Sequence, residues 1–210
     1  MKSAVIRLGA FACLLGFGFA AQAQSNISYT NIDLSYVNAD FDTVAGSVDG
    51  DGVNLAGSLE LHKNMHILGS YERVSPDGFD DLDTYSIGFG FHTPQMGRQE
   101  RQYSSNLMDR YSLFIDGNYI GMDSGGSGSD PTGYSVDLGL RSVNFTRMEA
   151  LFAVGYEKFE KIDGEFTVEG RLFIRILDNL QAQGRIDWND NTTRWFIGLR
   201  YNFPNVTIFD

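Results

Sequence analysis

The stretch Val53–Val74, VNLAGSLELHKNMHILGSYERV, decides the fold of this chain. Every second residue of its first half is apolar or glycine, namely Val53, Leu55, Gly57, Leu59 and Leu61. The turn Lys63–Asn64 separates this run from a second one, 65–74, with the same period. A period of two is typical of a strand with one apolar and one polar face. The stretch therefore predicts a hairpin of two strands of about ten residues each, the length that a tilted strand needs to cross a bilayer.

The same period recurs along the rest of the chain. We expect ten strands, at 27–37, 53–62, 65–74, 83–92, 109–120, 134–142, 148–159, 166–176, 180–189 and 194–203. In the first of them Tyr29 is out of phase with Ile32, Leu34 and Tyr36, so this strand either starts later or carries a bulge. The connection 93–108 is too long for a usual short turn, so eight strands are the alternative. The predicted fold class is all-β, an antiparallel transmembrane β-barrel of about ten strands.

A soluble β-sandwich is the competing fold, because a single amphipathic strand fits both. Two features favour the barrel. The polar faces carry Arg opposite acids on strand after strand, with Gly and Ser between them, which suits a crowded lumen. The connections also alternate in length, being short at Lys63–Asn64 and 177–179 but longer and rich in Asp and Gly at 38–52, 75–82 and 121–133. Short periplasmic turns that alternate with longer outer loops are typical of outer-membrane barrels, so we expect that location.

Met1–Ala23 has the pattern of a cleaved signal peptide: a short basic start, an apolar run and small residues at its end. Residues 24–203 would then form the barrel, and residues 204–210 a periplasmic C-terminal tail. The one cysteine, Cys13, lies within the signal peptide, which excludes a disulfide framework and any cysteine-based zinc site.

Charged side chains gather on the predicted inward faces. The acids there are Asp33, Glu60, Glu72, Asp116, Asp137, Glu149, Glu157, Glu169 and Asp187. The cations there are Arg110, Arg141, Arg171, Arg175, Arg185, Arg194 and Arg200. A planar, permanently charged guanidinium suits paired contacts with carboxylates in a confined space, and unpaired interior charges cost several kcal/mol each. We therefore expect a salt-bridged lumen filled by long side chains, with a narrow selective pore as the alternative.

Aromatic residues recur at one height on the outward faces. They are Tyr36, Tyr71, Tyr85, Tyr119, Tyr134, Tyr156, Trp188 and Trp195. Amphipathic rings favour the boundary between lipid and water. Their shared height predicts an aromatic girdle at the outer interface of the membrane.

Composition argues against several classes of function. A formal net charge of −11 disfavours nucleic acid as a partner, because phosphate binding needs clustered Lys and Arg. We expect no enzyme activity, because His62, His66 and His92 fall at predicted periplasmic ends and leave the outer rim without an imidazole base. An outer-leaflet lipid enzyme is the weakest alternative. We also expect no cofactor and no metal, since Asp49–Gly52 resembles only part of a calcium loop.

The predicted outer connections are strongly acidic. They hold Asp40, Asp42, Asp49, Asp51, Asp77, Asp80, Asp81, Asp83, Asp123, Asp130, Glu160, Asp163, Glu165 and Asp190, against the single cation Lys161. Such a surface repels anionic phosphates unless divalent ions bridge them. The expected partners are outer-membrane lipid and lipopolysaccharide, with divalent cations at these acids.

The last predicted strand ends in alternating aromatic residues. The run GLRYNF resembles the signal that the barrel-assembly machinery recognises, with Gly198, Tyr201 and Phe203 at its key positions. Pro204 has no N–H to give to a ladder, so the strand should stop there. We expect deletion of 204–210 to leave inserted protein, and Tyr201→Ser combined with Phe203→Ser to abolish insertion.

The stretch Val53–Val74 also resembles a family of small exported barrels of plant-associated bacteria, once proposed as immune-activating, quorum-sensing-linked proteins. Its members similarly have Gly-Ser before an Asn-x-His-Ile/Val-Phe/Leu-Gly-Gly/Ser-Tyr hairpin. EGRLFIRILDNLQAQGRIDW followed by RWFIGLRYNF is similar to the last hairpins of the family. The connection 93–108 departs from the family pattern. The resemblance implies an outer-membrane or surface-released barrel without known catalytic residues. We therefore expect a structural or cell-surface interaction role, with a narrow porin-like channel as the first alternative.

Overall fold

The computed structural model describes residues 27–43, 46–97, 110–125, 130–143, 147–160, 163–203 and 208. The predicted signal peptide lies outside these ranges, as do the predicted tail apart from Ile208 and most of the connection 93–108. Within the described ranges, no helix is long and apolar enough to cross a membrane.

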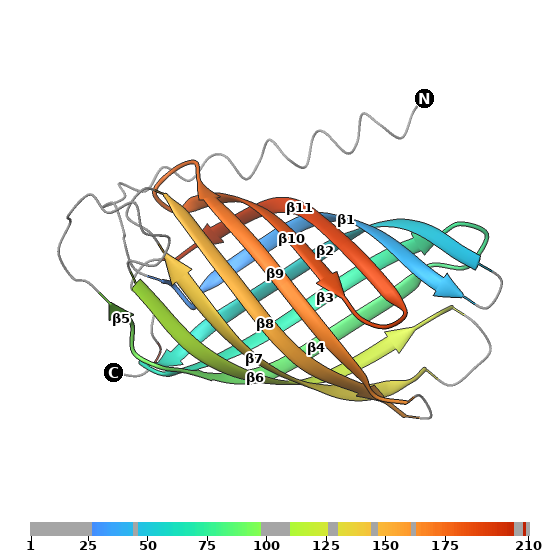
Figure 1. The fold of residues 1–210 in the computed structure, drawn as a ribbon, viewed down its shortest axis with the longest axis horizontal. Coiled ribbons are helices and arrows are strands. Elements are labelled where there is room, and N and C mark those ends of the chain that lie inside the picture. Colours follow the sequence, from blue (N-terminus) through green and yellow to red (C-terminus); the bar gives the residue numbers. More distant parts are fainter. Residues whose placement is uncertain are drawn as a thin grey trace.

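The described residues form one antiparallel sheet. Its strands are β1 (Asn31–Thr43), β2 (Gly46–His62), β3 (Met65–Pro76), β4 (Leu82–His92), β5 (Met96–Gly97), β6 (Arg110–Asp123), β7 (Thr132–Val143), β8 (Met148–Phe159), β9 (Glu165–Arg175), β10 (Leu180–Trp188) and β11 (Thr192–Asn202). Each long strand pairs with the next long strand, and β1 pairs with β11, so the sheet closes into a barrel, seen from its side in Figure 1. The short β5 pairs only with the start of β6. The prediction of a ten-stranded barrel is thus confirmed, and the eight-stranded alternative is wrong.

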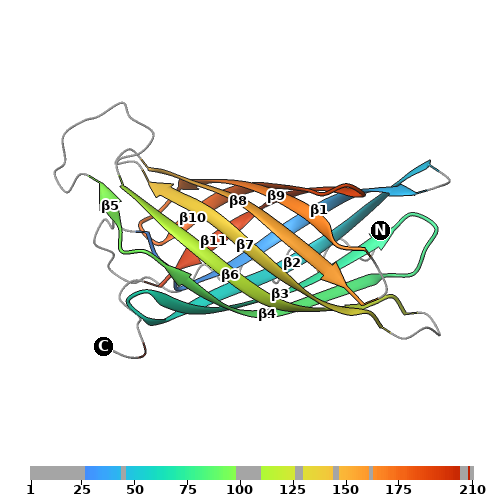
Figure 2. The ribbon, with the colours of Figure 1, turned by 60° about the horizontal axis from the view of Figure 1, so that its bottom comes forward.

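The strands extend further than the hydrophobic pattern predicts at one end of the barrel. β1 and β2 stay paired as far as Thr43 and Gly46, so most of the predicted loop 38–52 is strand. The connections predicted at 75–82 and 121–133 shrink in the same way, to 77–81 and 124–131. A ladder needs only backbone N–H and C=O groups, and it continues where both faces are polar and the alternation has faded. The two ends therefore differ in how far the strands project (Figure 2).

We call the projecting end the outer end. The opposite end, which carries the tight turn Lys63–Asn64, is the inner end.

The outward faces of the strands are apolar. Ile87 is 68% exposed and Ile197 is 74% exposed. Further exposed apolar residues on these faces are Ile32, Leu34, Leu55, Ile67, Phe89, Ile115, Leu138, Phe152, Val154, Leu172 and Ile174. A continuous apolar exterior is unfavourable in water but stable against lipid. The chain is therefore a membrane-spanning barrel.

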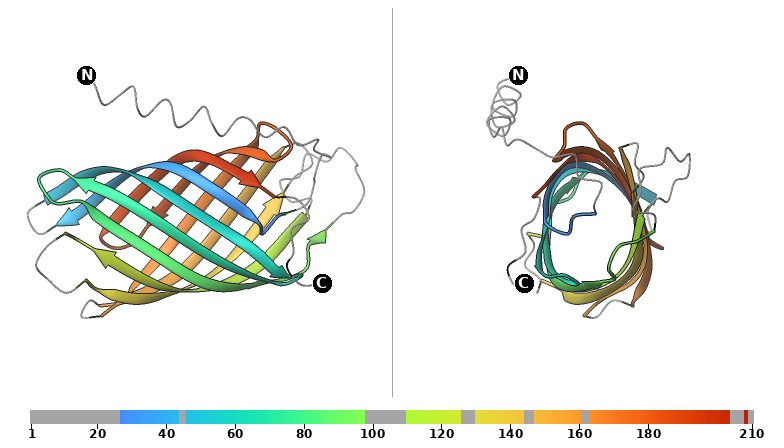
Figure 3. Two further views of the ribbon diagram at one scale, coloured as in Figure 1. Left: turned by 180° about the vertical axis from the view of Figure 1, so that it is seen from behind. Right: turned by 90° about the vertical axis from the view of Figure 1, so that its left-hand side faces the viewer.

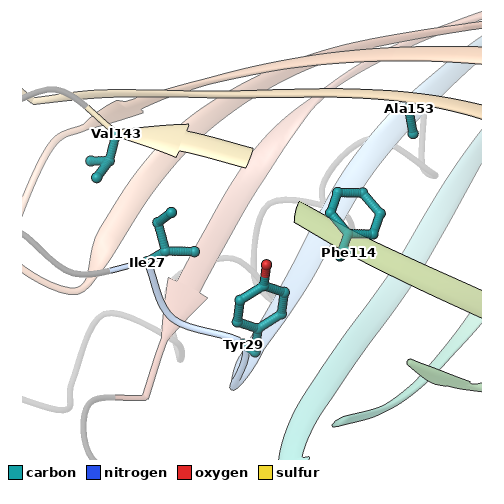
Figure 4. Packing of buried hydrophobic residues seen from close by; sticks show 5 residues of the cluster. All are labelled: Ile27, Tyr29, Phe114, Val143 and Ala153. Atoms are coloured by element: carbon teal, nitrogen blue, oxygen red, sulfur yellow. The ribbon is translucent and has the colours of Figure 1, made fainter. Parts of the chain in front are cut away.

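The residues just before β1 lie inside the lumen. β1 begins at Asn31, so the strand predicted from residue 27 starts later, as the phase of Tyr29 indicated. Residues Ile27–Thr30, which we call the N-terminal strap, lie within the ring of strands (Figure 3, right). Their apolar side chains pack with Phe114, Val143 and Ala153 in a buried cluster (Figure 4). The strap therefore occupies the inner mouth.

Candidate functional site in the barrel lumen

Ion pairs occupy one side of the lumen near the inner end. Arg200 on β11 donates two hydrogen bonds to Asp33 on β1, at 2.6 and 2.7 Å. Arg171 on β9 lies 3.6 Å from the same carboxylate. Arg141 on β7 pairs with Glu149 on β8, and Nη1 of Arg200 lies 3.9 Å from Glu149. Two carboxylates thus share three guanidinium groups.

A second group of ion pairs continues toward the outer end. Arg185 contacts both Asp187 and Glu169, the latter at 3.4 Å. Arg194 lies 3.3 Å from Glu72 and 3.8 Å from Asp187. Each of these acids is in reach of a guanidinium, which offsets much of the cost of holding charge inside the barrel.

Two of these contacts cross the lumen between strands that are not neighbours. Arg171 on β9 reaches Asp33 on β1 past β10 and β11. Arg194 on β11 reaches Glu72 on β3 past β1 and β2. These side chains narrow the lumen, and they hold together parts of the ring that the backbone ladder does not join directly. We call Arg171, Arg185, Arg194 and Arg200 the arginine wall.

Two phenylalanines are buried inside the arginine wall. The guanidinium carbon of Arg200 lies 4.0 Å from the centre of the Phe173 ring, and that of Arg185 lies 4.3 Å from the Phe196 ring. Stacking on an aromatic face adds to the paired hydrogen bonds of a guanidinium. Reasoning from sequence missed these rings, because each stands at a polar-face position. The sequence signal that could have found them is a phenylalanine two positions from an arginine, on the same polar face of a strand.

The opposite side of the lumen is built differently. Gly88 and Gly90 on β4 have no side chain, and the carboxamide of Asn118 and the carboxylate of Asp116 on β6 occupy the space that a Cβ would need. Asp137 on β7 occupies the space over Gly155 on β8 in the same way. The polar side chains therefore lie flat against the strands. We call Gly88, Gly90, Asp116, Asn118 and Asp137 the glycine wall.

Several predicted network residues lie outside the ion pairs. Asp137 accepts hydrogen bonds from Asn118 and Ser135 instead. Within the described part of the chain, no arginine pairs with Asp137, Glu60 or Glu157, and no acid pairs with Arg175. The register places Asp116 and Gly155 opposite Asp137, so no guanidinium stands beside it on either neighbouring strand.

A polar cavity lies between the two walls. It has a volume of about 260 Å³, enough for about nine water molecules. Its charged lining comprises Asp33, Glu72, Asp116, Asp137, Glu157, Glu169, Asp187, Arg141, Arg171, Arg185, Arg194 and Arg200. The lining extends from Asn189 at the outer end to Tyr29 in the strap. The cavity therefore carries more acids than arginines.

The histidines lie at the inner end. His66 is buried, with Nε2 3.0 Å from Asp116, and the His92 ring stacks on Tyr29 at 3.7 Å between ring centres. His62 is exposed beside the turn. Among the described residues, no group of three or more His, Cys, Asp or Glu side chains is placed to hold a metal ion.

The predicted girdle residues point away from the lumen. All of them are exposed except Tyr156, which is half-buried. Tyr71 stands directly opposite Tyr85, and Tyr119 opposite Tyr134. Neighbouring strands thus carry their rings at the same level, as a position at the membrane interface requires.

Some of the acids at the outer end accept hydrogen bonds from other side chains of the barrel. The Tyr36 hydroxyl donates to Asp51. Asp83 accepts hydrogen bonds from the Tyr71 hydroxyl, at 2.8 Å, and from the Arg73 guanidinium. Carboxylates engaged in this way have fewer free oxygens for divalent cations than the sequence suggests.

The predicted insertion signal lies on β11. Gly198 faces Ser35 of β1 so closely that a Cβ would collide with it, and the rings of Tyr201 and Phe203 pack edge to face at 4.9 Å. β11 ends at Asn202, next to the predicted stop.

No family model matches the chain. No curated protein matches it either.

Several solved structures are similar to this chain. A KdgM porin in complex with disordered oligogalacturonate has a TM-score of 0.45 and 11% identity, covering 82% of this chain and 99% of that one. The transport unit of the autotransporter AIDA-I from Escherichia coli has a TM-score of 0.48 and 10% identity, covering 96% and 98%. The COG4313 outer membrane channel from Pseudomonas putida F1 has a TM-score of 0.44 and 12% identity, covering 89% and 100%. No functional statement follows from identities this low.

Proposed function

We propose that this protein is a sealed, non-enzymatic outer-membrane β-barrel with a structural or interaction role at the cell surface. The observation that carries the proposal is the set of ion pairs that cross the lumen, above all Arg171 with Asp33 and Arg194 with Glu72. These side chains close one side of the lumen, and the N-terminal strap lies in its inner mouth.

The ion pairs keep their side of the lumen closed because they are costly to open. Withdrawing Arg200 from Asp33 would leave a carboxylate that is 4% exposed without its two strongest hydrogen bonds. Breaking a buried pair costs about 3–5 kcal/mol. Thermal fluctuation alone would therefore open this side of the barrel rarely.

The exterior supports the outer-membrane location. An apolar band, the girdle of Tyr and Trp, and the aromatic end of β11 together match what such barrels present to lipid and to the assembly machinery. The acids at the outer end would face the cell exterior. Contact with lipopolysaccharide there would run through divalent cations at acids that the barrel leaves free.

Cell fractionation followed by gel electrophoresis of heated and unheated samples tests the barrel and its location together. We expect the protein in the outer-membrane fraction, with faster migration before heating. Planar-bilayer recording tests the seal, and we expect no stable current steps from the wild-type protein. Recovery in the periplasm, or steady conductance, would contradict the proposal.

A narrow porin-like channel is the second candidate. The polar cavity between the two walls favours it, because a sealed core needs no continuous polar space. Steady current from the wild-type protein would favour this candidate over the sealed barrel. An assay of altered lipid A acylation, in which we expect no change, tests the lipid-enzyme alternative.

A further inference from the structure

The N-terminal strap is held in the inner mouth by side-chain contacts from several strands. The Tyr29 hydroxyl donates to Ser112 on β6 at 3.0 Å, and its ring stacks on His92 of β4. Arg141 on β7 donates to the carbonyl of Ser28 at 2.7 Å. Side chains of β4, β6 and β7 thus hold the strap in the inner mouth of the barrel.

Most of the strap is nevertheless separate from the ladder that holds the barrel. β1 pairs with β2 and β11 from Asn31 onward, and the last strap residue, Thr30, adds one backbone bond, accepted by its carbonyl from Phe203 at 2.9 Å. The strap is fixed by a small apolar cluster and by single hydrogen bonds, such as that from Gln95 to the carbonyl of Ile27 at 2.9 Å. Ile27–Tyr29 can therefore leave the inner mouth while Thr30 and the paired strands stay in place.

The cavity ends on the strap. Its lining at the inner end is Tyr29 together with Phe114, Leu151 and Ala153, which belong to or pack against the strap cluster. From there it extends past the glycine wall to Asn189 at the outer end. Since the side chains of the glycine wall lie flat, this side of the lumen stays open beside the ion pairs. The strap is the obstruction at the inner end of that path.

The chemistry of the path favours cations. Seven acids and five arginines are in its charged lining. Among the described residues, no arginine forms a direct ion pair with Asp137 or Glu157, and the hydroxyl of Ser135 and the amide of Asn118 donate hydrogen bonds to Asp137. Carboxyl groups that no guanidinium engages offer oxygen ligands to a cation.

We propose that the N-terminal strap is a gate, and that its withdrawal opens a path for small cations along the glycine wall. The proposal rests on the sealed resting state proposed above. The ion pairs of the arginine wall stay in place when the gate opens, because they lie on the other side of the cavity.

Planar-bilayer recording of the full chain tests the gate. The variant Ile27→Ala/Tyr29→Ala removes the two side chains that seat the strap. The matched control, Ile32→Ala/Phe89→Ala, removes an aliphatic and an aromatic side chain from the lipid face. We expect current steps from the strap variant at least ten times more often than from the control or the wild type. Heat-dependent gel migration of both variants shows that each barrel is folded.

A cross-link separates gating from damage. Ile27→Cys/Val143→Cys, placed in the Tyr29→Ala background, puts two thiols in the strap cluster, and the mature chain expected here has no other cysteine. A short cleavable thiol cross-linker should abolish the steps, and a reductant should restore them. Steps that persist after cross-linking would overturn the gate.

Selectivity tests the path. In a KCl gradient the open strap variant should prefer potassium over chloride, and adding Asp137→Asn/Glu157→Gln should lower that preference at least twofold. A silent strap variant with a silent wild type would refute the gate but leave the sealed barrel intact. Steady wild-type current would refute the sealed barrel instead.

Discussion

The two walls of one lumen solve the problem of polar side chains inside a membrane in opposite ways. On the arginine wall, long side chains are neutralised by acids on their own strand and on other strands, as Arg171 is by Glu169 on β9 and by Asp33 on β1. On the glycine wall, short side chains lie back over glycines, as Asn118 does over Gly88. The arginine wall fills its side of the lumen, and the glycine wall leaves its side of the lumen open.

This difference teaches that charge alone does not tell whether a barrel is closed. Asp33 and Asp137 both point into the lumen, yet the first accepts two hydrogen bonds from Arg200 and the second accepts only from an amide and a hydroxyl. What decides is the length of the opposing side chain. Stability should therefore depend on the arginine wall, and passage through the barrel on the glycine wall.

The largest effect is expected from Arg200→Ala. It leaves Asp33 with only the longer contact to Arg171 and removes the cation over Phe173. The free energy of unfolding, measured in urea with lipid vesicles, should fall by about 4 kcal/mol. Arg200→Lys should recover part of the loss, because an ammonium keeps the charge without the paired geometry. A loss below about 1 kcal/mol would mean that water solvates Asp33 well enough to replace the arginine.

A smaller loss is expected from Arg171→Ala. Both of its acids keep another arginine, since Asp33 retains Arg200 and Glu169 retains Arg185. We expect a loss of about 2 kcal/mol, below the range for an uncompensated buried charge. Arg175→Ala is the matched control on the same face of β9 and should change stability by less than about 0.5 kcal/mol. Equal losses from both variants would show that packing, and not pairing, holds this wall.

The glycine wall is tested by Gly88→Ala. A Cβ there would meet the Asn118 carboxamide and the backbone carbonyl of Gly117, which cannot move aside. We expect a loss of about 1.5 kcal/mol in the same unfolding experiment. Gly184→Ala is the control, because a Cβ there meets nothing within 4 Å. If Gly88→Ala proves as neutral as this control, Asn118 does not lie against β4 as described.

The smallest effect on stability is expected from Asp137→Asn. No arginine of the described chain loses a partner, and an amide still accepts from Ser135 and Asn118. The free energy of unfolding should stay within about 0.5 kcal/mol of the wild-type value. A large loss would reveal a cation partner for Asp137 and would make the two walls alike.

Hydrophobic alternation predicted most of the barrel but failed where its physical cause is absent. It placed ten strands correctly because every second residue between the interfaces must face lipid. It lost the projecting parts of β1 and β2, up to Thr43 and from Gly46, because water on both faces imposes no pattern there. It extended the first strand too far back, into the strap, because Ile27 and Tyr29 are apolar for a different reason: they fill the mouth of the barrel.

The sequence by itself determined which residues face inward and that arginine would be the inward cation, since alternation assigns the faces and residue type assigns the charge. It determined the apolar exterior and the outward Tyr and Trp residues in the same way. Only the tertiary structure decided which charges meet. Asp33 and Arg171 are far apart in the chain and lie on strands that are not neighbours, so their contact depends on the curvature of the closed sheet. The strap was likewise decided by closure, because a lumen exists for Tyr29 to fill only once β1 has paired with β11.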